Sequence, residues 1–179
     1  VNLKREALLL EETFTKRAVI GEKENKMGYI YLPKFYTSFD DENGRSCADD
    51  IAADIKELLK ENISGLNLDL RDNGGGSLYE VIKMTGLFVG EQPVVQVKFK
   101  DKKPTIANAE GVKQVYKGKL IVLVNERSAS AAEIFAAAMQ DYQRGIIMGS
   151  ASTFGKGTVQ RTFKIPGKNF NVVKEDLGT

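Results

Sequence analysis

The sequence predicts an α/β fold built around a largely parallel central sheet. Two observations support this prediction. Short apolar segments typical of strands alternate along the chain with segments of helical periodicity, and the most apolar run, Leu120–Val124, is typical of a strand near the centre of a sheet. A chain of 179 residues is long enough to bury the core of one such domain.

Each element follows from the local residue pattern. Short apolar segments bounded by glycine, proline or charged residues predict strands at residues 29–32, 66–70, 94–99, 120–124, 146–148 and 158–165. Apolar positions three or four residues apart predict helices at residues 46–63, 77–88 and 130–142. Residues 100–118 are polar and irregular, so we expect a surface segment there, and Val172–Val173 could begin another strand.

Composition excludes several classes of function. The 26 basic and 24 acidic residues are mixed along the chain, so nothing indicates binding to nucleic acid or to an anionic lipid surface. The apolar runs are too short to cross a bilayer. Cys47 is the single cysteine, so neither an internal disulfide nor a cysteine metal cluster can form, and we expect a structural role for it.

The lack of histidine in the sequence restricts the chemistry further. It excludes the Ser-His-Asp triad, the Cys-His dyad and the H-E-x-x-H zinc site together. If the chain hydrolyses a substrate by nucleophilic attack, another residue must accept the proton, and lysine is the natural candidate. We expect no metal and no cofactor.

A predicted strand, a short turn and an alanine-rich helix meet at Ser130. A hydroxyl at the start of a helix lies where backbone N–H groups and the helix dipole favour developing negative charge, which suits a nucleophile. Ser130 and Glu133 also match a capping box, which needs no catalysis. This segment alone favours the capping interpretation.

Two glycine-containing loops could complete a catalytic site. Glycines on both sides of Lys156 let the backbone turn sharply, although the segment alone favours a solvated turn lysine, and its spacing does not match a phosphate-binding P-loop. Residues 71–77 contain Gly74–Gly76 between a strand and a helix. Such a loop either aims backbone N–H groups at an anion or is a plain flexible turn.

Together the three segments contain the parts of a Ser-Lys acyl-transfer site: a hydroxyl nucleophile, a lysine base and a loop of hydrogen-bond donors. The lysine must be uncharged to accept a proton, so burial has to lower its pKa from about 10.4 toward neutrality. We expect Phe154 and the apolar strand Ile146–Met148 to supply that burial.

The same residues show a family resemblance. The chain resembles the tail-specific, or carboxy-terminal processing, proteases, serine peptidases that trim proteins from their C-terminal ends. The matching segments are residues 68–76, 128–142 and 153–160, and the resemblance covers roughly residues 27–160. It implies a crotonase- or Clp-protease-like β-β-α core and peptide-bond hydrolysis through an acyl-enzyme.

The resemblance also implies a role for each matching residue. By position, Ser130 would be the nucleophile, Lys156 its base and Gln160 the residue that orients the lysine. The oxyanion hole would come from the amides of Ala131 and of Gly75 or Gly76. Ser128 remains the alternative nucleophile, and Asp141 matches an acidic position of bacterial relatives for which we expect a structural role.

Substrates and setting follow from the resemblance as well. It implies unstructured protein C-termini with small apolar terminal residues as substrates, and a periplasmic or cell-envelope location. A non-catalytic scaffold that binds protein tails is the rival interpretation. An acyl-CoA enzyme of the same architecture would need a CoA-binding surface that the sequence does not identify.

The family pattern divides the chain into three parts. We expect residues 1–26 to be a strand segment that leads from a PDZ peptide-binding module, with trailing strand residues of that module at Val1–Arg5. Residues 27–165 are expected to form the protease core, and residues 166–179 a truncated C-terminal segment. Between Gly149 and Thr153 the chain has one more residue than the commonest family pattern, so the lysine loop is expected to sit differently.

Overall fold

The computed structural model describes residues 11–22, 25–37, 44–99, 102–164 and 171–178, without the side chains of residues 11, 159–164 and 171–178. The strand residues predicted at Val1–Arg5 lie outside this described part. The division at residues 26 and 165 stays a prediction.

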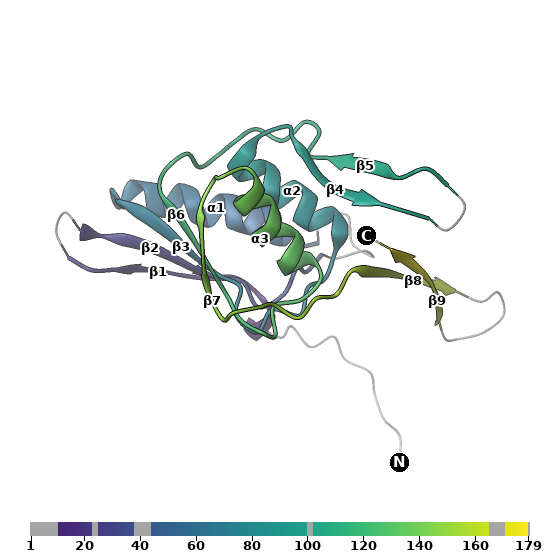
Figure 1. Cartoon of the computed structure of the whole chain (residues 1–179). Helices are drawn as coiled ribbons and strands as arrows, with labels where there is room; N and C mark the ends of the chain where they lie inside the picture. The colour runs from purple at the N-terminus through teal and green to yellow at the C-terminus, as the bar shows by residue number, and fades with distance from the viewer. Residues whose placement is uncertain (1–10, 23–24, 38–43, 100–101, 165–170, 179) are drawn as a thin grey trace, which may run out of the picture.

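A five-stranded sheet forms the centre of the fold, with strand order β1-β2-β3-β6-β7 (Figure 1). Strands β2, β3, β6 and β7 are parallel, and β1 pairs antiparallel with β2. The strands are β1 (Lys16–Ile20), β2 (Met27–Tyr31), β3 (Gly65–Asp69), β6 (Leu120–Val124) and β7 (Ile146–Gly149). The predicted α/β class with a largely parallel sheet is confirmed. Strand β6 is internal, between β3 and β7, while β3 occupies the middle of the sheet.

The helices begin where the sequence places serine. They are α1 (Cys47–Lys60), α2 (Leu78–Val89) and α3 (Ala131–Asp141), and a short 3₁₀ turn, η1 (Glu11–Thr13), precedes β1. The hydroxyls of Ser46 and Ser77 accept hydrogen bonds from the amides of Asp49 and Glu80 and so cap α1 and α2. Helix α3 starts differently, at Ser130, and that difference bears on the site.

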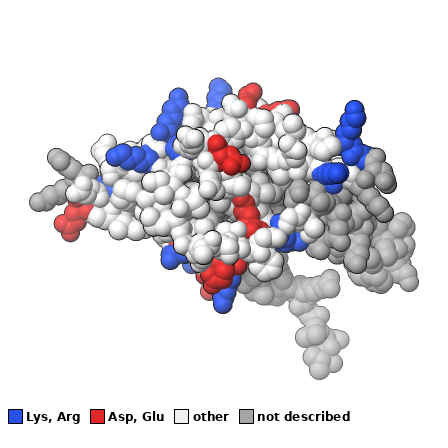
Figure 2. Space-filling model, in the orientation of Figure 1, with Lys and Arg blue, Asp and Glu red and all other residues white. Residues whose placement is uncertain are grey.

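Within the described residues, the helices cover one face of the sheet. The register aligns Leu66 and Leu68 of β3 with Leu120 and Val122 of β6, and all four are buried against the helices. Most residues on the opposite face are half-buried or exposed, among them Ile146 at 63% and Met148 at 52%, but Asp69 of β3 is buried there and pairs with Arg71. Figure 2 shows basic and acidic side chains interspersed over one side of the molecule, with no large patch of one sign.

Two antiparallel hairpins lie outside the central sheet (Figure 1): β4 (Pro93–Val97) with β5 (Thr105–Asn108), next to α2 and α3, and β8 (Thr158–Lys164) with β9 (Asn171–Gly178). The strand suggested at Val172–Val173 is confirmed as part of β9. The expectation of an irregular surface segment at residues 100–118 was wrong in part: the described residues there are mostly irregular and exposed or half-buried, but they include β5. They also include Tyr116, which is buried against the ring of Phe88.

Three loops meet at one edge of the sheet. They follow β3, β6 and β7, and the carboxyl ends of neighbouring parallel strands lie at the same edge. These loops carry the glycine run, Ser130 and Lys156 respectively, so the topology gathers the three predicted segments. No helix in the described part of the chain combines the length and apolarity that crossing a membrane requires.

Candidate active site

Ser130 lies at a strained turn between β6 and α3. Its φ is 55° and its ψ is −114°, in the left-handed half of backbone space that non-glycine residues enter at a cost of about 1–3 kcal/mol. A serine at a sharp turn from a strand into a helix is presented in the manner of a nucleophile elbow. The residue is half-buried.

The capping interpretation of Ser130 is confirmed only in part. Ser130 and Glu133 have the capping-box arrangement, and the Ser130 amide donates to Glu133 Oε2 at 2.8 Å. The Glu133 amide, however, donates to the backbone carbonyl of Ser130 at 2.9 Å, and the Ser130 hydroxyl accepts no capping hydrogen bond. The hydroxyl therefore stays available for chemistry.

The hydroxyl of Ser128, the alternative nucleophile, is used in hydrogen bonds that stabilise the fold. Its side chain is fully buried, and its hydroxyl donates to the Leu70 carbonyl at 2.8 Å and accepts from the Asn125 amide at 2.9 Å. These two hydrogen bonds join the ends of β3 and β6. The geometry therefore favours Ser130 over Ser128.

The glycine loop packs directly against Ser130. Gly75 has a φ of +97°, and a Cβ at that position would lie 2.8 Å from the Cβ of Ser130 and 2.8 Å from the carbonyl oxygen of Ala129. Only glycine lets the two loops approach so closely. The contact brings the first and third predicted segments together.

Asn73 holds this contact in place, and the sequence analysis missed it. Its side chain is fully buried, donates to the Leu32 carbonyl at 2.8 Å and accepts from the Gly75 amide at 2.8 Å. Its backbone carbonyl accepts from the Ala129 amide at 2.9 Å. One residue thus fixes both the glycine loop and the turn before Ser130. The signal available was an asparagine immediately before the glycine run, which we interpreted only as part of a turn.

The loop amides differ in availability. The Gly75 amide is taken by Asn73, whereas the hydrogen bonds formed among the described residues include none donated by the amides of Gly76 or Ala131. Gly76 is exposed, and Ala131 is the first residue of α3, where an amide has no partner within its own helix. Both N–H groups lack a partner among the described residues; that of Gly76 lies on an exposed residue, and that of Ala131 on a buried one.

The lysine loop is anchored to Glu133. The carboxylate accepts hydrogen bonds from the Thr153 hydroxyl at 2.7 Å, the Gly155 amide at 2.5 Å and the Lys156 amide at 2.8 Å, besides the one from Ser130. Burial by itself would raise the pKa of the Glu133 carboxyl, but these four donors outweigh it and hold the pKa below its ordinary value. Glu133 therefore joins the Ser130 turn to the Lys156 loop, a role that its local capping pattern did not reveal.

The Lys156 side chain is half-buried, and its Nζ lies 3.4 Å from the hydroxyl oxygen of Thr158, with no hydrogen bond to the Ser130 hydroxyl. We expected Phe154 and the strand Ile146–Met148 to bury the Lys156 amine, and that expectation was wrong. Phe154 is 66% exposed, and Ile146 and Met148 point to the uncovered face of the sheet. The backbone of Gln160 belongs to β8, four residues after Lys156, and its side chain lies outside the described part.

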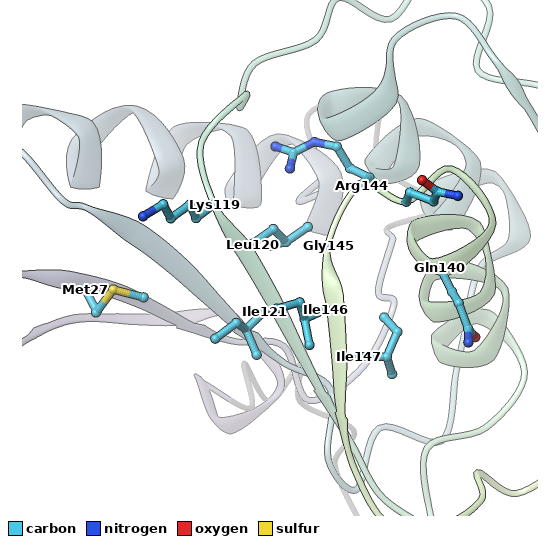
Figure 3. A pocket seen from close by; sticks show the side chains of 10 residues that line it. Met27, Lys119, Leu120, Ile121, Gln140, Arg144, Gly145, Ile146 and Ile147 are labelled. Carbon is cyan, nitrogen blue, oxygen red and sulfur yellow. The ribbon is translucent and has the colours of Figure 1, made fainter.

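Other features lie away from this site. Asp141 is exposed at the far end of α3, about 16 Å along the helix from Ser130. A cavity of about 650 Å³ opens at the amino ends of β6 and β7, where Lys119 and Gly145 are among its lining residues (Figure 3), and none of the predicted site residues lines it. No group of His, Cys, Asp or Glu side chains in the described residues is arranged to hold a metal ion.

Comparison with known proteins gives consistent matches. The sequence profile of Peptidase family S41 matches residues 26–175. The chain is 39% identical to the Tail-specific protease of Haemophilus influenzae over 166 residues, which is 90% of this chain and 22% of that protein. It is 37% identical to the Probable CtpA-like serine protease of Staphylococcus epidermidis over 153 residues, 84% of this chain and 29% of that protein.

The fold is also found among solved structures. The photosystem II D1 C-terminal processing protease superposes with a TM-score of 0.69 at 28% identity, covering 83% of this chain and 39% of that one. A putative S41 protease from Bacteroides fragilis superposes with a TM-score of 0.70 at 18% identity, covering 91% of this chain and 45% of that one. The chain spans less than a third of the length of the two curated relatives.

Proposed function

The chain belongs to Peptidase family S41, and from that premise we propose that it cleaves peptide bonds in protein tails through an acyl-enzyme on Ser130, with Lys156 as the general base. The observation that carries the proposal is the Ser130 turn. Its hydroxyl is free of capping hydrogen bonds, its Cβ lies against Gly75, and Glu133 connects it to the lysine loop.

The proposed reaction uses groups of this chain alone. The Ser130 hydroxyl attacks the carbonyl carbon of the scissile bond while the uncharged amine of Lys156 takes its proton. The lysine then gives this proton to the leaving amine, and the acyl group stays on Ser130. A water molecule, deprotonated by the same lysine, attacks the ester; the lysine then gives that proton to the leaving Ser130 oxygen, which releases the new C-terminus and restores the free hydroxyl and amine.

The negative charge that develops on the substrate's carbonyl oxygen needs hydrogen-bond donors that are already in position. We assign this role to the amides of Ala131 and Gly76, which are unpaired among the described residues, rather than to the Gly75 amide, which Asn73 occupies. Donors that are already oriented stabilise the oxyanion without reorganisation during the reaction. Gln160 would orient Lys156, whose amine has to leave the Thr158 hydroxyl to reach Ser130.

The substrate class is the finer part of the proposal. Relatives are named for tail-specific proteolysis and for C-terminal processing, which supports unstructured protein C-termini as substrates. A periplasmic or cell-envelope setting belongs to the same proposal. Protein tails are the partners it requires, and it requires no metal or cofactor.

Cleavage of an unstructured peptide with a small apolar C-terminus tests the proposal. We expect the wild-type chain to cleave it, Ser130→Ala to abolish cleavage, and Lys156→Ala to lower kcat by about 10²- to 10⁴-fold, as the loss of a general base does. Mass spectrometry would detect the acyl-enzyme as an adduct on Ser130. Binding without cleavage by the wild-type chain would instead support the tail-binding scaffold, and full turnover by Lys156→Ala would remove the proposed base.

A further inference from the structure

Phe154 is a large apolar side chain left in solvent beside the candidate site. Its exposed fraction is 66%, and it lies between Thr153 and Gly155, two residues before Lys156. The aromatic contacts formed among the described residues do not include its ring. Nothing in the described fold therefore explains why this position carries phenylalanine.

The backbone that presents this ring is fixed on three sides. The Phe154 amide donates to the Ser128 carbonyl at 3.0 Å, in the turn that leads to Ser130. The two neighbouring residues donate to the same oxygen of Glu133, the Thr153 hydroxyl at 2.7 Å and the Gly155 amide at 2.5 Å. The exposed ring thus stands on an ordered loop that touches both sides of the nucleophile turn.

An ordered loop with an exposed aromatic ring is prepared for a contact. Covering apolar surface favours binding in proportion to the area removed from water. A binding surface whose backbone is already ordered loses little conformational freedom when the partner arrives. The ligand that must come close to Ser130 is the substrate chain, so the substrate is the occupant that the position of Phe154 indicates.

We propose that Phe154 determines substrate specificity by packing its ring against an apolar side chain of the peptide next to the scissile bond. This inference rests on the proposed function. The same contact would cover the loop around Lys156 and remove water from it. The burial that the lysine lacks in the unbound chain would then come from the substrate, and cleavage would depend on an apolar residue at the contacted position.

A binding experiment tests this contact independently of turnover. The Ser130→Ala variant, which cannot acylate, is titrated with fluorescent peptides that carry leucine or serine at the positions flanking the bond cut by the wild type, or at the centre of the peptide if no bond is cut. We expect leucine to strengthen binding at one of these positions by about tenfold or more. Adding Phe154→Ala should abolish that preference, and Phe154→Leu should restore most of it.

A matched control uses Ile106, which is 57% exposed on β5. Ile106→Ala removes a similarly exposed apolar side chain and should leave the preference for leucine unchanged. Circular dichroism of each variant verifies that the fold is kept. Equal weakening of leucine and serine peptides by Phe154→Ala would mean that the ring only maintains the loop, and it would overturn the inference.

Kinetics separate this inference from the proposed function. If the wild type cleaves both peptides and Phe154→Ala lowers kcat/KM only for the leucine peptide, both stand. If the wild type cleaves and Phe154→Ala leaves the ratio unchanged, the contact is refuted and the protease assignment stands. If no cleavage occurs but the binding preference depends on Phe154, the peptidase proposal falls and the contact stands. If neither cleavage nor a binding preference occurs, both fall.

Discussion

Replacing Glu133 by glutamine should uncouple the lysine loop from the Ser130 turn. The substitution keeps the size of the side chain and removes its charge. The amide nitrogen should take the place of Oε1, because the Thr153 hydroxyl on that oxygen can rotate and become an acceptor. The Gly155 amide would then face another donor and lose its 2.5 Å hydrogen bond.

The expected loss of stability in Glu133→Gln follows from the hydrogen bonds that the substitution removes or weakens. The exposed Gly155 amide loses its hydrogen bond. The amides of Ser130 and Lys156, which donate to Oε2, keep an acceptor, but this acceptor no longer carries a charge. We expect Glu133→Gln to lower the free energy of unfolding by about 2 kcal/mol. That corresponds to a fall in Tm of about 4–8 °C for a domain of this size.

The effect on catalysis should be larger than the effect on stability. If the loop that carries Lys156 moves by about 1 Å, kcat/KM should fall by about 10²-fold, because proton transfer depends on position. Peptide cleavage at a temperature where the variant is fully folded measures this fall, and thermal unfolding followed by circular dichroism measures the change in stability.

Glu80 provides the matched control. Its buried carboxylate also accepts several donors, the Ser46 hydroxyl at 2.6 Å and the Ala48 amide at 2.9 Å among them, but these lie at the start of α1. Glu80→Gln should lower Tm and keep the kcat/KM of the folded protein. Wild-type kcat/KM in Glu133→Gln, or an equal fall in both variants, would show that Glu133 does not position the lysine loop.

Further predictions concern the packing and ionisation around the site. Gly75→Ala should destabilise the fold by about 1–3 kcal/mol and abolish cleavage, whereas Gly74→Ala, whose Cβ would meet nothing within 4 Å, should do neither; unfolding and cleavage assays of the pair compare them. Ser128→Ala should lower the free energy of unfolding by about 1–3 kcal/mol yet keep kcat/KM in the folded protein. If the folded variant loses turnover, Ser128 and not Ser130 is the nucleophile. Because the folded pKa of Glu133 lies below its ordinary value of 4.5, the stability it contributes is present above that value and lost as pH falls through the folded pKa; the Tm of the wild type should fall over that acid range, and an equal fall in Glu133→Gln would refute this cause. Burial, and to a smaller extent the Glu80 carboxylate, raises the pKa of the Cys47 thiol. A maleimide should therefore label Cys47 at pH 8 only after denaturation, which mass spectrometry of the intact protein measures.

The fold was largely predictable because most of its elements carry their own signal. Strand β3 alternates leucines with polar residues, and α1 repeats apolar residues at helical spacing, so both were found within a few residues of their ends. Strand β5 was missed, because Thr105–Asn108 is short, has only two apolar residues, is mostly exposed and is paired only with β4. Its strand character comes from that pairing and not from its own sequence.

The site was predictable in its parts but not in its connections. The sequence offered Ser130, Lys156 and the glycine run as candidates, and the topology brings their loops to one edge of the sheet. It did not reveal that Glu133 spans the Ser130 and Lys156 loops, because a capping pattern three residues after a serine already accounts for a glutamate. Long-range hydrogen bonds of this kind have no local signature.

The anchoring of the lysine loop to Glu133 begins at Thr153, and this has a consequence for evolution. Residues 150–152, where the family resemblance implies one extra residue, are exposed and precede the first hydrogen bond to Glu133. A gain or loss of a residue there changes the length of a solvent-facing bend. Insertions and deletions should therefore accumulate between Gly149 and Thr153 among relatives, while the spacing from Thr153 to Lys156 stays constant.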